Sequence, residues 1–263
     1  MSAYGATVAS RFAATLQYRA AAIAGVGTQV FFGLVRVMIL EAFYASGAAA
    51  VPLRRADVLA YVWIGQALIR LVSISADPAV AASIRSGAIA YELARPVDLY
   101  GLWYARALGD RAATFALRAP PILLLAALFF DLAPPPTALA ALLFLASLVL
   151  ALALATSIAV LLTTSLLWTV SGEGISRLVP PLVFFFSGVV VPLPLLPDVV
   201  QRAVAFLPFR ALLDTPARIW AGDLAGRAAG LALGHQLAWL VVLVAGGRLM
   251  LARGERRLVI DGG

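Results

Sequence analysis

The sequence of 263 residues is 63% hydrophobic and 13% charged, and its mean hydropathy is +0.97. Water-soluble domains carry about 25% charged residues, so this composition excludes an ordinary soluble domain and predicts one all-α integral membrane domain over residues 1–263. The net charge is +7 without any lysine, which excludes a standard P-loop because that motif needs a Gly-Lys-Ser/Thr sequence.

The first quarter of the chain predicts an interfacial helix and two membrane spans. Residues 6–19 have an amphipathic pattern, in which apolar side chains lie on the membrane while Arg11 and Arg19 meet lipid headgroups. Spans are expected at 21–44 and 57–76, because each stretch has close to the 20 or so apolar residues that a crossing helix needs.

Residues 78–95 predict a short cytoplasmic helix in the largest polar connection of the chain. Asp77 before Pro78 is typical of a helix start, because the carboxylate caps free N–H groups and proline suits the first helical position. Pro96 ends this helix. Asp98 is predicted to cap a further helix, whose mixture of aromatic residues and arginines is typical of the membrane interface.

The second half of the chain predicts four more spans and one irregular segment. Spans are expected at 112–132, 137–164 and 176–191. Residues 192–225 are divided by several prolines and predict half-helices that dip into the outer leaflet, where protein or water must satisfy the backbone. The last span is expected at 227–250, followed by a basic tail.

The distribution of arginines predicts the orientation in the membrane. With both termini in the cytoplasm, the cytoplasmic segments carry more arginines than the outer segments, as the positive-inside rule requires. We therefore expect a multi-pass protein of the inner (plasma) membrane with six spans and both termini cytoplasmic. Because the arginines are scattered between apolar runs, they suit anionic membrane lipid better than nucleic acid.

Three segments and the carboxyl terminus are similar to one transporter family. Residues 86–98 are similar to a cytoplasmic "G…L-x-R-P-x-D" segment, and residues 186–197 to an outer "S-G-x-x-x-P-L" segment. Residues 207–223 are similar to the stretch before a final span, and the closing Gly262-Gly263 is similar to one subgroup. In this order, over nearly the whole chain, the sequence resembles an ABC-2 type permease, the transmembrane subunit of an ABC exporter.

The resemblance implies a transport subunit that is not itself an enzyme and binds no cofactor. ATP and Mg would be held by two separate ABC ATPase subunits, and a second permease would complete the substrate pathway. The subgroup resemblance favours a related second permease over an identical one. The alternative is an ion-coupled secondary transporter. The candidate contacts for the ATPase subunits are Arg85, Tyr91, Glu92 and Arg95.

Polar residues inside predicted spans are candidates for the substrate pathway or for a seam between two permeases. A charge near the middle of the bilayer costs several kcal/mol unless it is paired, so such residues are functional candidates. The alternative for the arginines is pairing with Glu41 or with carbonyl groups, or snorkelling to the surface, and for His235 a hydrogen bond between helices. The candidates are Gln29, Arg36, Arg70 and His235.

Gly226, Gly230 and Gly234 form a ridge of small residues at the start of the last span. Glycines at this spacing let helix backbones approach closely. We expect the ridge to pack against another helix, either within the bundle or across a dimer.

Overall fold

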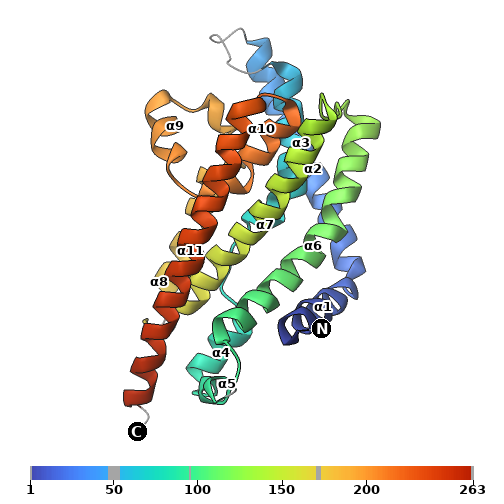
Figure 1. The fold of residues 1–263 in the computed structure, drawn as a ribbon. Coiled ribbons are helices and arrows are strands. Elements are labelled where there is room, and N and C mark those ends of the chain that lie inside the picture. The colour runs from blue at the N-terminus through green and yellow to red at the C-terminus, as the bar shows by residue number, and fades with distance from the viewer. Residues whose placement is uncertain (1, 47–53, 95, 170–172, 262–263) are drawn as a thin grey trace.

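The computed structural model describes residues 2–46, 54–94, 96–169 and 173–261, and in this part of the chain it contains helices and no β-strand (Figure 1). The prediction of an all-α protein is therefore confirmed. The helices are α1 (Ala3–Leu16), α2 (Arg19–Ala45), α3 (Arg55–Val72), α4 (Pro78–Arg85), α5 (Ile89–Leu93), α6 (Leu99–Phe129), α7 (Ala138–Ser165), α8 (Glu173–Phe186), η1 (Leu193–Leu195), α9 (Asp198–Ala205), η2 (Phe209–Leu212), α10 (Asp214–Ala221) and α11 (Gly226–Asp261).

Four of the described helices, α2, α6, α7 and α11, are long and apolar enough to cross a membrane. The helix α3 has 18 residues but carries three charged side chains, Arg55, Asp57 and Arg70. The helix α8 has 14 residues and so measures about 21 Å, short of the roughly 30 Å of the hydrocarbon core. The chain is therefore a multi-pass membrane protein, while the predicted number of six spans is not established by helix length and composition.

The helix α6 combines two elements that the sequence predicts as separate. It runs without interruption from Leu99 to Phe129, through both the interfacial helix expected after Asp98 and the span expected at 112–132. The Asp98 carboxylate accepts a hydrogen bond from the Gly101 N–H and so caps this helix, as predicted. The polar residues near its start therefore lie on one long helix and do not mark a separate interfacial element.

Two further boundaries differ from the sequence prediction. The single helix expected over 78–95 is divided into α4 and α5, because Gly87 between them has a φ of 74° and leaves the right-handed helical region. The basic tail expected after residue 250 is helical, since α11 continues without a break to Asp261. Arg253 and Arg256 of that tail therefore lie on the helix.

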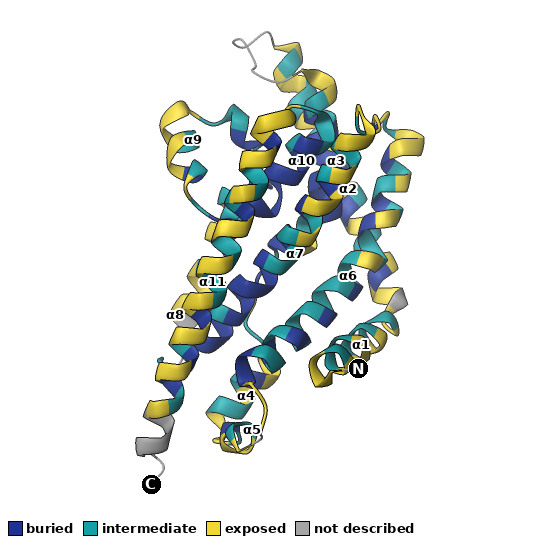
Figure 2. Cartoon of the chain, in the orientation of Figure 1, coloured by how far each residue is buried: buried dark blue, intermediate teal, exposed yellow. Residues whose placement is uncertain are grey.

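The buried centre of the bundle is α3, which α2, α6, α7 and α10 surround. Its side chains from Tyr61 to Leu68 are almost entirely withdrawn from the surface, and Trp63 and Ile64 are fully buried. By contrast, exposed residues run along α11 and the outer side of α2, as Figure 2 shows for α11. Apolar exposed faces of this kind are expected where lipid or a second membrane subunit covers the protein.

The two termini lie toward the same end of the molecule, together with α1, α4 and α5 (Figure 1). The short helices α9 and α10 lie at the opposite end (Figure 1). The segment 192–225 thus contains short helices, and these helices gather at one end of the bundle. We call the end that holds α4 and α5 the α4–α5 end.

Candidate functional site

The start of α4 is fixed by its own cap and by a bond to α7. The Asp77 carboxylate accepts hydrogen bonds from the N–H groups of Ala79 and Val80, at 2.8 and 3.4 Å, and Pro78 occupies the first turn. The Asp77 N–H donates to the Thr163 hydroxyl on α7, at 2.9 Å. The predicted cap is confirmed, and it attaches this short helix to one of the long helices.

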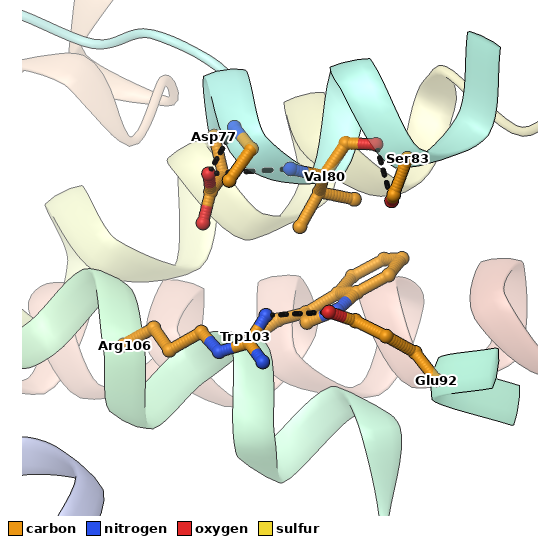
Figure 3. Close-up of polar contacts among 7 residues, drawn as sticks. Asp77, Val80, Ser83, Glu92, Trp103 and Arg106 are labelled. Atoms are coloured by element: carbon orange, nitrogen blue, oxygen red, sulfur yellow. Dashed lines mark hydrogen bonds and ion pairs between the residues drawn. The ribbon is translucent and has the colours of Figure 1, made fainter. Parts of the chain in front are cut away.

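Apolar contacts hold α4 and α5 against α6, and Figure 3 shows Val80 of α4 beside Trp103 of α6. Val80 of α4 and Ile89 of α5 are buried in the same cluster as Trp103 of α6, which is 2% exposed. Val160 of α7 and Leu251 of α11 belong to the same cluster. The two short helices are therefore packed onto three of the long helices and do not hang from the bundle as a loose loop.

Glu92 ties α5 to α6 through two charge-assisted hydrogen bonds (Figure 3). Its carboxylate accepts from the Trp103 indole N–H at 2.9 Å and from the Arg106 guanidinium at 2.9 Å. The side chains of Glu92 and Arg106 are 18% and 14% exposed, respectively. Bonds of this type are roughly twice as strong as bonds between neutral groups, particularly away from bulk water.

The outer face of α4 and α5 presents two of the four residues predicted to contact an ATPase subunit. Arg85 is exposed at the end of α4, and Tyr91 is 79% exposed on α5. Glu92 points inward to α6, so it can position α5 but does not lie on the outer face. Arg95, like Gly262-Gly263, lies outside the described residues.

Two of the polar residues predicted inside spans lie between α2 and α3. The Gln29 amide is 6% exposed and donates to the main-chain oxygen of Gln66, at 3.0 Å. With the Gln66 amide oriented to satisfy its neighbours, its oxygen accepts from the Arg36 guanidinium at 2.9 Å. Glu41 pairs with Arg55, at 2.7 Å, and among the described residues no ion pair joins Arg36 to Glu41. Arg36 also borders an apolar cavity of about 110 Å³ next to Tyr61 and Gly188.

Of the other two predicted residues, Arg70 lies on α3 one turn after Gln66, and His235 lies on α11. Arg70 is in the last turn of α3 and borders a polar cavity at the α4–α5 end. His235 accepts a hydrogen bond from the Trp239 indole N–H one turn later on α11, at 3.1 Å. Arg36 and Arg70 therefore border different cavities, and His235 lies on a different helix from the other three residues.

A buried charged cluster at the opposite end was missed in the sequence. Asp214, at the start of α10, is 1% exposed and accepts a hydrogen bond from the Tyr61 hydroxyl, at 3.1 Å. It lies 3.6 Å from Arg210 and 3.7 Å from Arg218, and Arg218 also pairs with Asp223. Burial raises the pKa of the Asp214 carboxyl, and the two arginines oppose that rise. The cluster anchors the segment 192–225 on α3.

The glycine ridge on α11 does not pack against any other described part of the chain. Gly226, Gly230 and Gly234 are exposed, and a β-carbon added to any of them would have no neighbouring side chain or helix of the described residues within 4 Å. Of the two possibilities considered for this ridge, packing inside the bundle is therefore not observed.

These features define a multi-pass helical membrane protein in which two short helices, α4 and α5, are fixed to the long helices at one end. The protein-family model described as "ABC-2 family transporter protein" matches residues 23–262, which is nearly the whole chain. The chain belongs to this family and is the permease of an ABC transporter. Comparisons with curated proteins and with solved structures give no match.

Proposed function

We propose that the protein is the permease subunit of an ABC exporter and that α4 and α5 form the surface to which an ATPase subunit docks. The observation that carries this proposal is the attachment of α4 and α5 to the long helices. Thr163 holds the start of α4 on α7, and Glu92 holds α5 on α6. A force applied to the exposed Arg85–Tyr91 face would therefore reach two membrane helices directly.

Two separate ATPase subunits would bind ATP and Mg²⁺, since this chain has no lysine for a P-loop. Closure of those subunits would push on α4 and α5. The push would tilt α6 and α7 together, because the capped helix and the Glu92 bonds transmit displacement as rigid connections. Rigid-body motion of packed helices is a common way to convert a local event into a larger rearrangement.

The proposed topology has six crossings of the plasma membrane, with both termini in the cytoplasm. An even number of crossings is supported by the two termini, which lie at the same end of the molecule (Figure 1). The shorter helices α3 and α8 would then span the membrane together with the segments that directly follow them in the chain. The short helices of residues 192–225 would fill the outer end next to α3 and α7.

A second permease would cover the exposed face of α11. Gly226, Gly230 and Gly234 leave room there for a close helix contact, and Leu237 and Val241 are exposed on the same helix. The similarity of Gly262-Gly263 to one subgroup of these permeases supports a related second permease over an identical one. In such a pair, Arg36 would lie next to the apolar cavity by α2 and α3 and could border the substrate pathway.

Recovery of partners from native membranes tests this proposal. The tagged full chain is purified in mild detergent, and co-purifying subunits are identified and quantified by mass spectrometry. We expect a P-loop ATPase in stoichiometric amount, together with a second permease. Arg85→Glu and Tyr91→Ala should each lower ATPase recovery, whereas Tyr18→Ala, an exposed tyrosine outside α4 and α5, should not.

A folded chain that is repeatedly recovered alone from membranes would contradict the exporter proposal. Proton-dependent transport by such a chain in sealed vesicles would then support the alternative, an ion-coupled secondary transporter. Equal recovery of the ATPase by wild type, Arg85→Glu and Tyr91→Ala would contradict the docking surface while leaving the ABC transporter itself in place.

A further inference from the structure

Three arginines from three different helices border one polar cavity at the α4–α5 end. Arg11 comes from α1, Arg70 from the last turn of α3 and Arg111 from α6. The cavity has a volume of about 270 Å³ and reaches the first turn of α4. The other polar residues that line it are Ser73, Ser75, Asp77, Asp110, Thr114 and Thr163.

The two carboxylates that face this cavity are already engaged by other groups. Asp77 caps α4 through the N–H groups of Ala79 and Val80. Asp110 accepts a hydrogen bond from the Thr15 hydroxyl, at 3.1 Å, although Arg11 and Arg111 also act on it electrostatically. Three guanidinium groups thus face two carboxylates, and the cavity has an excess of positive charge.

Most hydrogen-bond donors of the three arginines have no acceptor among the described residues. Arg111 donates to the main-chain oxygen of Ser73 at 3.4 Å, which is long for a hydrogen bond. Within the part of the chain that the structure describes, neither Arg11 nor Arg70 makes a hydrogen bond or an ion pair. Each guanidinium has five N–H donors, so the cavity offers many donors to a ligand. The three positive charges also repel one another, and a bound anion would relieve this repulsion.

We propose that this cavity binds a phosphate-type anion, and specifically the phosphate of an anionic phospholipid headgroup. Arginine suits this ligand because its planar fork of donors matches two phosphate oxygens at once. The volume is slightly below the range of about 300–1,000 Å³ that is usual for ligand pockets. It therefore suits a headgroup and excludes a whole lipid, whose acyl chains would lie outside.

The position of α1 favours a lipid as the source of the phosphate. Gly109 lets α1 lie directly on α6, since a β-carbon there would be 2.7 Å from the Val8 carbonyl oxygen and 2.8 Å from the Arg11 β-carbon. This contact carries Arg11 to the edge of the cavity. The choice of lipid rests on the proposed topology, in which this end faces the cytoplasmic leaflet, where anionic lipids are enriched.

Retention of lipid by the purified full chain tests the proposal without any ATPase. The chain is incorporated into nanodiscs of phosphatidylcholine mixed with phosphatidylglycerol, released in the mass spectrometer, and the bound lipids are counted. We expect phosphatidylglycerol to be retained preferentially. Arg11→Gln and Arg70→Gln should each weaken its retention about tenfold, the expected effect of losing one charge-assisted contact.

Arg253→Gln is the matched control, because Arg253 is exposed on α11 and does not border the cavity. It should retain phosphatidylglycerol like the wild type. Each variant is also compared with the wild type by thermal unfolding in detergent, and only variants that unfold at the wild-type temperature are interpreted. Arg11 and Arg70 both suit this purpose, since neither makes a hydrogen bond within the described residues that the substitution would break.

A second arm distinguishes the source of the anion. Inorganic phosphate is titrated onto the lipid-free chain, and the thermal midpoint is followed. Stabilisation by phosphate that Arg11→Gln abolishes, without preference for phosphatidylglycerol, would keep the phosphate-type anion and assign a free anion as its source. If neither probe binds, or if the variants bind both probes like the wild type, the proposal is wrong. Recovery of the ATPase would be unaffected by that failure.

Discussion

The Glu92 carboxylate lies 2.9 Å from the Arg106 guanidinium, and both side chains are largely withdrawn from the surface. This ion pair links α5, a helix of only five residues, to the long helix α6. A helix of that length is not stable by itself, because a first helical turn fixes several residues for one hydrogen bond. The pair therefore holds a helix that would not be stable alone against the membrane bundle, as the proposed docking of an ATPase subunit requires.

The Glu92→Gln substitution should loosen this link with little change in shape. The neutral amide keeps a bond to Trp103 but loses the charge that holds Arg106, so we expect the free energy of unfolding to fall by about 1.5–3 kcal/mol. Thermal unfolding of the purified chain measures this effect. Recovery of an ATPase subunit should fall as well, since α5 would no longer be held in place.

The adjacent residue provides the control for this prediction. Tyr91 is 79% exposed, so Tyr91→Ala should leave the thermal midpoint unchanged and yet lower ATPase recovery if α5 is the docking surface. A thermal midpoint that does not respond to Glu92→Gln would mean that the pair does not stabilise the fold.

Local chemistry made part of this region predictable from the sequence. Asp77-Pro78 and Asp98 are short-range helix signals, and both carboxylates cap a helix as expected. The inward direction of Glu92 was not predictable, because its partners lie 11 and 14 residues away on another helix. The continuity of α6 was also missed, since polar residues on a long helix look like those of an interfacial segment.

The buried Asp214 cluster shows a second limit of sequence analysis. Its arginine partners are four residues away, a spacing that is visible in the sequence, but its hydroxyl partner Tyr61 is 153 residues away. The same pattern of charges on an exposed helix would be an unremarkable set of surface pairs. Only the folding of residues 192–225 onto α3 turns these charges into a buried anchor.

Substitution of Gly188 should destabilise the protein for two separate reasons, backbone strain and a steric clash. It has a φ of 92°, and a β-carbon there would overlap with the Tyr61 hydroxyl. Gly188→Ala should therefore lower the free energy of unfolding by about 1–3 kcal/mol from backbone strain, with a further loss from the clash. Thermal unfolding in detergent measures the sum of the two effects.

The clash and the strain can be separated in a double-mutant cycle. Tyr61→Phe removes the hydroxyl, so Gly188→Ala should be less damaging in that background than in the wild type. Gly27→Ala is the control, because a β-carbon at Gly27 meets no described residue within 4 Å and Gly27 lies inside α2. Purely additive losses for Gly188→Ala and Tyr61→Phe would show that the two residues do not interact.

Asp214→Asn should be far more damaging than Asp223→Asn. Removing the buried charge leaves Arg210 without its ion-pair partner and Arg218 with only Asp223, and breaking a buried pair in this way costs about 3–5 kcal/mol. The Asp223 side chain is 32% exposed, so its loss should cost about 1 kcal/mol or less. Denaturation of both variants in parallel gives the comparison, and similar losses would mean that Asp214 is not the anchor of this segment.

Gly230→Leu tests the pairing face of α11. The position is exposed and has no neighbour on another element of the described chain, and leucine is a better helix former than glycine, so the fold of the single chain should tolerate the change. If a second permease packs on this ridge, the larger side chain should separate the two helices. We expect pairing to weaken about tenfold, which corresponds to about 1.4 kcal/mol.

Gly246→Leu is the matched control for Gly230→Leu, because Gly246 is also exposed on α11 with nothing within 4 Å of an added β-carbon, yet it lies outside the ridge. Co-purification of the second permease and native mass spectrometry in detergent measure pairing, while thermal unfolding checks each chain. Loss of pairing in Gly230→Leu alone would place the contact on the ridge of Gly226, Gly230 and Gly234. Equal pairing of both variants would exclude the ridge and direct the search to the exposed face of α2, where Phe31 and Ile39 are uncovered.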